Sequence, residues 1–591
     1  MVENTLVVHG FAVFVGAFLV GKEKTMNRKE ILIFLLVLAA ALAIRIYFVP
    51  APGYEHDIMH YKQWGQATVE YGVHNVYEKS ICEYPPVFVY ILKTVCSFYK
   101  EFYPKFDEHT YLYDFLIKAP SMLADIIASL GIFIFLRRKN SFKFSLIAMS
   151  AYAFNPVIIM DSAVWGQTDA ISTLIALGAI FALINNRFAL SWSLIIFGML
   201  TKLQLVVLLP LIILITMKRG GFSGLLRGLA ASWCTYVVVM APFLYFHKAD
   251  LGFTRLFNTV GQYPFLSLFA FNFWWLIGQG QARWLSDTGM FLNLWTYRTL
   301  GMLIFALFYV PLLSYLYNNE KDENAVFYAA AMASFAYYML PTEMHERYIM
   351  LVFIFLLFTA LRDRKLWIAY AALSFSTIFS LLYVLFSVYP FDYPGLPLFF
   401  KSVPLGIALS IINITAFLYM SSELFKRFKL KDIVITLAAG VFILTVYNYI
   451  KPVRPVYLSD LVPKASEQQW GELHMNRTVD NHTLTVNGFI YPKGIGTHAN
   501  SSVEFILDGR YRILEGAVGI DDESRRDNKI EALVYADNKL IYKSGIIPGW
   551  IDPRYFRLNI KGVKVIKLII SDGGDGINYD HGDWLGIKAL P

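Results

Sequence analysis

The stretch ILIFLLVLAAALAIRIYFVP, residues 31–50, is followed after two residues by GYEHDIMHYKQWG, residues 53–65. The first stretch is long and apolar enough to cross the hydrocarbon core of a bilayer, which takes about 20 residues. The second places an acid, Asp57, and two imidazoles, His56 and His60, directly after that crossing. This junction predicts a membrane protein that gathers titratable side chains at one face of the bilayer.

Apolar runs recur along the 591 residues, of which 57% are hydrophobic and only 16% are charged. This pattern predicts a polytopic α-helical membrane protein rather than a soluble globular one. By hydropathy there are about thirteen membrane segments. They lie at 31–50, 119–136, 144–160, 169–185, 190–200, 203–217, 228–246, 299–317, 325–340, 348–361, 366–389, 402–420 and 433–450.

Basic residues cluster in the short loops between these runs, so the net charge of +8 indicates topology and not a nucleic-acid partner. The positive-inside rule then puts the N-terminus in the cytoplasm and the C-terminus outside. It leaves residues 51–118 as a long first extracytoplasmic loop, in which 87–98 forms an interfacial helix. Residues 1–30 form an N-terminal segment. Its apolar run at 6–20 fits a signal-like segment, although MNRKE from Met26 also reads as a start.

Further polar groups fall on the same outer face. They come from NPVIIMDSAVWGQTDA with Asp161, Gln167 and Asp169, from the junction of two short helices within 190–217 with Lys202 and Gln204, and from PTEMHERY with His345, Glu346 and Arg347. Ionisable groups at membrane depth normally line a cavity or pair with one another, so we expect one shared site. Alternatives remain at single positions: Asp57 and Asp169 as helix N-caps, and Arg347 as an interfacial side chain.

The ordered motifs over residues 30–420 resemble the GT-C superfamily of membrane glycosyltransferases. The motifs are HDIMHYKQWGQATVEYGVHNVYE, EYPPVFVYIL, NPVIIMDSAVWGQTDAI, TKLQLVVLLP, YPFLSLFAFNFW and PTEMHERYIM. They are most similar to the prokaryotic mannosyltransferase-like branch, related to the second mannosyltransferase of glycosylphosphatidylinositol assembly. The resemblance implies a GT-C-like domain over 31–450, a polyprenyl-phosphate sugar donor, and Asp57 as general base. Some members carry two adjacent acids at this point, where this chain has His56 before Asp57.

The residue types fit this chemistry. Glycosyl transfer needs a base for the acceptor hydroxyl, which Asp57 can provide, and cations for the leaving phosphate, for which Lys202 and Arg347 are candidates. Gln204 and His345 can hydrogen-bond the donor, and FNFWW, residues 271–275, offers aromatic faces for the sugar or the isoprenoid, or interfacial anchors. We expect no metal site, since no ligand spacing is present. A divalent ion stays an alternative because Asp and His both bind metals.

The composition changes after residue 450. KPVRP ends the last apolar run, and short alternating segments such as SVEFIL, KIEALVYA and KVIKLII follow, so 456–591 is predicted to be an extracytoplasmic all-β domain. GIGTH, GAVGIDDES and DGGDGINYDHGDW within it closely resemble NPCBM modules, which are β-sandwiches. The resemblance implies glycan binding, with His498, Asp521, Asp522, Asp580, His581 and Trp584 in the matching motifs. The same motifs could instead be conformational signatures that close the sandwich.

Together these observations predict a multi-pass membrane glycosyltransferase that moves a hexose, preferentially mannose, from polyprenyl phosphate to an extracytoplasmic acceptor glycan or glycolipid. A transporter or flippase of lipid-linked sugars would also place charges in the membrane, but it commonly has repeated halves, and no internal repeat is found here. The third alternative is a catalytically inactive, membrane-anchored glycan-binding protein.

Overall fold

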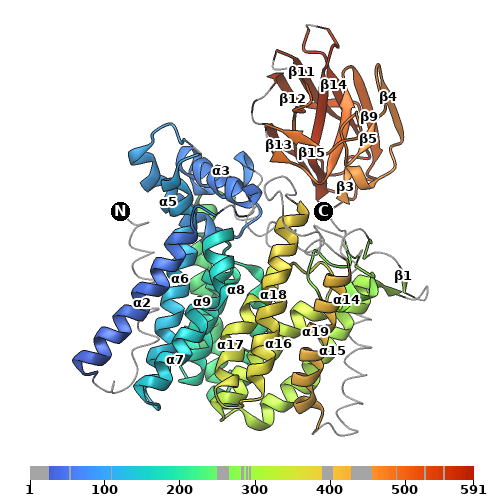
Figure 1. Cartoon of the computed structure of the whole chain (residues 1–591). Coiled ribbons are helices and arrows are strands. Elements are labelled where there is room, and N and C mark those ends of the chain that lie inside the picture. The colour runs from blue at the N-terminus through green and yellow to red at the C-terminus, as the bar shows by residue number, and fades with distance from the viewer. Residues whose placement is uncertain are drawn as a thin grey trace. The chain divides into compact units, whose positions relative to one another are not determined.

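The computed structural model describes residues 26–248, 265–388, 403–426 and 456–590, apart from short gaps within these ranges. Its contacts divide the chain into two compact units (Figure 1). One unit contains residues 1–66, 84–256 and 263–449, and the other contains 67–83, 257–262 and 450–591. The first is mainly helical and includes one antiparallel strand pair, β1 (Met290–Phe291) and β2 (Trp295–Thr296). The sandwich that follows residue 455 makes up most of the second.

The helices of the first unit follow the apolar pattern of the sequence. They are α2 (Arg28–Phe48), α3 (Glu55–Tyr71), α5 (Pro86–Phe102), α6 (Tyr111–Arg137), α7 (Phe142–Ala153), α8 (Pro156–Ile159), α9 (Asp169–Ile184), α10 (Phe188–Met199), α11 (Leu209–Ile215), α12 (Gly221–Tyr245), α14 (Phe273–Ile277), α15 (Tyr297–Asn319), α16 (Glu323–Met339), α17 (Met350–Ala360), α18 (Leu366–Val388) and α19 (Val403–Phe425). A short helix, α4 (Val76–Lys79), lies in the other unit.

Local sequence sets the ends of these helices. α2 begins at a capping box, in which Asn27 accepts from the backbone N–H of Glu30 and the Glu30 carboxylate accepts from the N–H of Asn27. α6 begins at Thr110, whose hydroxyl accepts from the N–H of Tyr113. Asn155 and Pro156 start the short helix α8 after a break, so α7 and the following helical residues meet at 49°.

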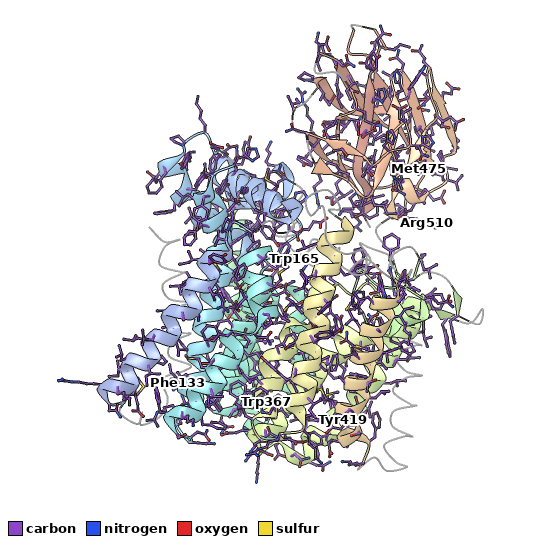
Figure 2. The ribbon with its side chains drawn as sticks, in the orientation of Figure 1. Phe133, Trp165, Trp367, Tyr419, Met475 and Arg510 are labelled. Carbon is purple, nitrogen blue, oxygen red and sulfur yellow. The ribbon has the colours of Figure 1, made fainter. Side chains whose placement is uncertain are left out.

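Six helices of the described part are long and apolar enough to cross a membrane, or seven if the bent pair counts as one span. The six are Arg28–Phe48, Tyr111–Arg137, Leu203–Tyr245, Tyr297–Asn319, Leu366–Leu385 and Val403–Phe425. Twelve of the thirteen predicted segments fall on helices, but 203–217 and 228–246 join in one long span and several others form shorter helices. The thirteenth, 433–450, lies outside the described residues. Figure 2 shows Trp165 at one end of this bundle and Phe133 and Trp367 towards the other.

The C-terminal domain is a β-sandwich, as predicted. One sheet has the order β13-β10-β15-β8-β5, with β3 also paired to β15, and the other has the order β12-β11-β14-β9-β4. The strands are β3 (Val456–Tyr457), β4 (Ala465–Gln468), β5 (His474–Met475), β8 (Gly494–His498), β9 (Ser501–Ile506), β10 (Ile513–Ile520), β11 (Lys529–Ala536), β12 (Lys539–Pro548), β13 (Arg554–Asn559), β14 (Val565–Ser571) and β15 (His581–Leu590), with a separate pair β6 (Thr485–Val486) and β7 (Phe489–Ile490).

Alternate residues of these strands point into one core. β11 and β14 expose and bury successive side chains in turn, which is the period-2 pattern of a half-buried strand. Ile495, Phe505, Val518, Leu568 and Trp584 are all 1% exposed or less and pack in a single cluster between the sheets. The sandwich therefore has a hydrophobic core of its own.

Candidate functional site

Asp57 lies in the first turn of α3, half-buried, and is held by the chain segment that links α8 to α9. The side-chain amide of Gln167 donates a hydrogen bond to Asp57 Oδ2. Gln167 is fixed in turn by Tyr61, whose hydroxyl donates to Gln167 Oε1 at 3.2 Å and lies 3.1 Å from the hydroxyl of Tyr84. The acid predicted to be the base is therefore oriented by an amide.

The turn at Gly166 brings Gln167 and Asp169 to this place. Residues Met160–Trp165 form a π-helical turn, and Gly166 ends it with φ of 70°. A Cβ at Gly166 would lie 2.8 Å from side-chain carbons of both Ile58 and Lys118. Only glycine combines this backbone conformation with so close an approach to α3 and α6. The non-helical segment that follows carries the polar side chains into the protein interior.

Asp169 is completely buried and both of its carboxylate oxygens lie 2.7 Å from Lys202 Nζ. Gln204 Nε2 donates to Asp169 Oδ1 at 3.0 Å. Lys202 lies between α10 and the short helical segment from Leu203, where the sequence predicts two helices to meet, and its ammonium lies 5.3 Å from the ring centre of Tyr348. Thr168, not Asp169, is the N-cap residue of α9, so the carboxylate of Asp169 serves the ion pair.

Arg347 comes from the segment between α16 and α17 and joins the same cluster. Its Nη1 lies 3.1 Å from Glu346 Oε1, and its Nε lies 4.0 Å from Asp169 Oδ2. Burial opposes the charge of this side chain, but the carboxylates of Glu346 and Asp57 raise the pKa of Arg347 above its ordinary value. Nε is buried and has no hydrogen-bond partner within the described part of the chain. The side chain is thus a largely buried cation, 14% exposed, with donor capacity to spare, rather than an interfacial anchor.

The remaining predicted residues lie around this cluster with different contacts. His345 Nδ1 is 3.9 Å from Glu346 Oε2, and its ring meets Tyr348 edge to face with centroids 5.2 Å apart. Asp161 is buried, and its Oδ1 has no hydrogen-bond partner among the described residues. His56 lies in the first turn of α3, and its side chain is outside the described atoms.

A second ionic network, which sequence reasoning missed, fixes the segment that carries Arg347. Arg298, in the first turn of α15, donates to both carboxylate oxygens of Asp287, at 2.6 and 2.9 Å, and also pairs with Glu343. Thr342 Oγ1 donates to Asp287 Oδ2 at 2.8 Å. Arg298 and Asp287 lie outside the quoted motifs. The sequence signal that could have found them is an acid and a base on the two sides of a short, mostly apolar run.

The aromatic run 271–275 differs from both of its predicted roles. Phe271, Trp274 and Trp275 are at most 1% exposed and form an internal cluster with Tyr383. Asn272 caps α14 by accepting from the backbone N–H groups of Trp274 and Trp275. Only Phe273 of the run has an exposed ring, so these residues form interior packing and not a sugar platform.

In the sandwich, some of the predicted glycan-binding residues lie beside an exposed aromatic ring, and one is buried in the core. His498 and His581 lie together, with ring centroids 5.3 Å apart, beside Trp470, which is half exposed. Burial lowers the pKa of both histidines, so both rings are neutral at neutral pH. The prediction for Trp584 needs correction: its ring is buried in the core against Phe556, because β15 points it between the sheets, and it cannot reach a glycan.

The acidic residues of the sandwich motifs hold loops together. Asp521 accepts from the N–H groups of Thr485 and Glu523, each at 2.9 Å, and Asp522 accepts from the N–H of Asn487 at 2.6 Å. Asp580 is buried, and its carbonyl accepts from the N–H of Ala499. These contacts fit the alternative that the motifs close the sandwich. A further group, Asp480, Glu523 and His581, brings three potential metal ligands together.

The fold and the clusters thus define a class: a multi-helical chain with membrane-length apolar helices, a buried charged cluster and a separate β-sandwich. Residues 454–589 match the NPCBM/NEW2 domain family, which confirms the resemblance seen in the sequence of this domain. The family covers this domain alone.

Known proteins similar to the chain fall into two groups. Alpha-1,3-galactosidase B of Akkermansia muciniphila is 31% identical over 124 residues, which are 20% of this chain and 16% of that protein. The CBM51 module of a Clostridium perfringens GH95 protein, solved with methyl-galactose, is 35% identical and aligns over 23% of this chain and 99% of its own, with a TM-score of 0.22. The chain therefore shares only a small part of the galactosidase's length.

One solved structure aligns over nearly the whole chain. Arabinosyltransferase EmbB of Mycobacterium smegmatis covers 99% of this chain with 67% of its own, at 12% identity and a TM-score of 0.29. A TM-score of that size carries no argument about fold or activity. What the helical part does must be argued from its own side chains.

Proposed function

We propose that the helical part is a GT-C-type glycosyltransferase, which moves a hexose, specifically mannose, from a polyprenyl-phosphate donor to an extracytoplasmic acceptor glycan or glycolipid. The observation that carries the proposal is that Asp57, Lys202 and Arg347 belong to one cluster of polar side chains. The three residues come from distant segments of the chain, and Gln167 and Asp169, two positions apart, connect them. An acid for proton removal and cations for a phosphate are the two requirements of this reaction.

Asp57 has the role of general base in this proposal. Its Oδ2 accepts a hydrogen bond from Gln167, which leaves Oδ1 to take the proton of the acceptor hydroxyl. The hydroxyl oxygen of the acceptor attacks the anomeric carbon as it loses this proton. The bond from the anomeric carbon to the phosphate oxygen then breaks, and polyprenyl phosphate leaves with the extra negative charge.

Arg347 is the better placed of the two cations for the leaving phosphate. The ammonium of Lys202 is already paired with Asp169, because it donates to both carboxylate oxygens. Arg347 donates one hydrogen bond, from Nη1 to Glu346 Oε1, and its Nε has no hydrogen-bond partner among the described residues. Its planar guanidinium can pair with two phosphate oxygens at once. Lys202, Gln204 and His345 then complete the donor site around it.

In this proposal the sandwich binds the acceptor glycan. Its match to the NPCBM/NEW2 domain family and its similarity to a part of a galactosidase support this role. The half-exposed Trp470, with His498 and His581 beside it, offers the aromatic face on which a sugar ring can stack. A multi-pass membrane location with the N-terminus in the cytoplasm and this domain outside is part of the proposal.

The test is an assay of purified protein with a panel of radiolabelled polyprenyl-phosphate sugars. We expect one hexose donor, the mannosyl one, to be consumed in the presence of an acceptor. Asp57→Asn keeps the size of the side chain and its contact with Gln167 but removes the base, so transfer should fall about 100-fold or more while donor binding persists.

The matched control is Glu101→Gln, an acid in the same predicted outer loop that is exposed and lies at the end of α5. It should transfer at the wild-type rate. Consumption of no donor at all, or equal turnover by Asp57→Asn and Glu101→Gln, would reject the proposal.

A further inference from the structure

Three side chains of the sandwich place potential metal ligands around one point. One ligand atom from each of Asp480, Glu523 and His581 lies within 4.8 Å of the other two. Asp480 belongs to the turn before β6, Glu523 to the turn after β10, and His581 starts β15. The sequence separates them by 43 and 58 positions, so only the fold brings them together.

His581 provides the buried side of this group. Its side chain is 5% exposed, and Nδ1 lies 3.7 Å from Asp480 Oδ2 without a hydrogen-bond partner among the described residues. A buried ring nitrogen normally has a partner, because leaving it unpaired costs free energy. The side chains of Asp480 and Glu523 are 42% and 27% exposed, so a solute can reach that nitrogen past the two carboxylates.

Backbone contacts fix the two turns that carry the carboxylates. Asp521 accepts from the N–H groups of both Thr485 and Glu523, which ties the turn after β10 to β6. The turn around Asp480 is closed by Thr478, which accepts from the N–H groups of Asn481 and His482. The backbone that carries the two carboxylates is therefore held in place before any ion binds, which lowers the ordering cost of binding.

We propose that Asp480, Glu523 and His581 bind one divalent transition-metal ion, for which Zn²⁺ is the best fit. One imidazole nitrogen and two carboxylate oxygens form a ligand set that suits Zn²⁺, whereas Ca²⁺ prefers six to eight oxygens. The exposed side leaves a coordination position for water or a sugar hydroxyl. His482, whose Nδ1 contacts Glu523 Oε1, orients that carboxylate from outside. The site shares His581 with the proposed glycan platform but takes no part in the proposed transfer chemistry.

The experiment uses the full chain, purified through a tag without histidine, stripped with a chelator and dialysed against ZnCl₂. Bound zinc is measured by elemental analysis, and affinity by competition with a chromophoric chelator. We expect one zinc per chain. Asp480→Asn and Glu523→Gln alter exposed side chains that do not support the core, and each should weaken binding at least 10-fold. His482→Ala should weaken it less than either ligand variant.

Glu467→Gln, an exposed acid on β4, is the matched control and should bind zinc as the wild type does. The proposal is overturned if the chain holds no zinc beyond that of a blank, if Asp480→Asn and Glu523→Gln both retain full affinity, or if an equal concentration of Ca²⁺ displaces the zinc. Circular dichroism of the apo variants shows that the sandwich is intact, so a lost site is not an unfolded domain.

Discussion

Asp169 holds the buried cluster together, and this limits which neighbouring side chains can report on function. It binds Lys202 with both oxygens and Gln204 with one, at a fully buried position. Removing Lys202 would leave an uncompensated buried carboxylate, which typically costs about 3 to 5 kcal/mol of stability. Loss of activity in a Lys202 variant would therefore mix folding with catalysis. Arg347 has one uncommitted nitrogen but also pairs with the buried Glu346, so Arg347→Lys, which keeps the charge beside Glu346, is the cleaner probe.

Substitution of Arg347 should weaken use of the donor. Arg347→Ala removes a charge-assisted contact with the phosphate. The resulting drop in kcat/KM for the donor should correspond to a loss of roughly 1.5 to 3 kcal/mol of transition-state stabilisation. Arg347→Lys should recover only part, because an ammonium cannot pair with two phosphate oxygens in the fork geometry of arginine. Donor titrations at saturating acceptor measure both. Wild-type values for both variants would remove Arg347 from the donor site.

At the scale of elements, α3 matters because it carries Asp57 and packs closely on α5. A Cβ on Gly65 would come 2.1 Å from Cys96 Sγ, and Cys96 lies against the Tyr113 hydroxyl at 3.3 Å. Burial raises the pKa of the Cys96 thiol to about 12, so almost no thiolate forms at pH 8 and the group should resist maleimide in the folded protein.

Gly65→Ala should disturb that contact. The added methyl pushes Cys96 or α3 aside, so we expect Cys96 to become reactive towards maleimide at pH 8 and transfer to fall about 10-fold as Asp57 moves. Labelling is followed in a chain with Cys82 and Cys234 replaced by serine. Cys96→Ala combined with Gly65→Ala relieves most of the clash and should restore transfer. An unreactive Cys96 and full activity in the single variant would show that α3 does not depend on this packing.

Sequence patterns predicted helices and strands far better than they predicted contacts. Apolar length marked the helices, and alternation marked β11 at its observed bounds, because burial imposes those periods locally. The charged cluster around Asp169 was also predictable in part, since charges at membrane depth must pair. The burial of Trp584 and the Asp480–Glu523–His581 group were not, because each depends on which distant segments the fold brings together.

For the whole molecule, a further prediction follows from the proposal that the helical part transfers the sugar and the sandwich binds the acceptor glycan. A chain cut after residue 455 keeps every proposed catalytic side chain. It should transfer sugar to a short soluble acceptor at a near-normal rate and lose efficiency on a long glycan, because the tethered module no longer raises the local acceptor concentration. Rates of full-length and truncated protein on short and long acceptors make the comparison. Equal loss on both, with the helical part folded, would place the sandwich in the reaction site itself.

The central claim is that the charged cluster breaks a bond and does not simply conduct a lipid-linked sugar. The most direct measurement follows a donor labelled in both its sugar and its lipid, with full-length protein reconstituted in sealed vesicles and an acceptor outside. We predict that the sugar label passes to the acceptor while the lipid label stays behind as polyprenyl phosphate, and that Asp57→Asn stops this separation. Movement of both labels together across the bilayer, undiminished in Asp57→Asn, would contradict the account and favour a flippase.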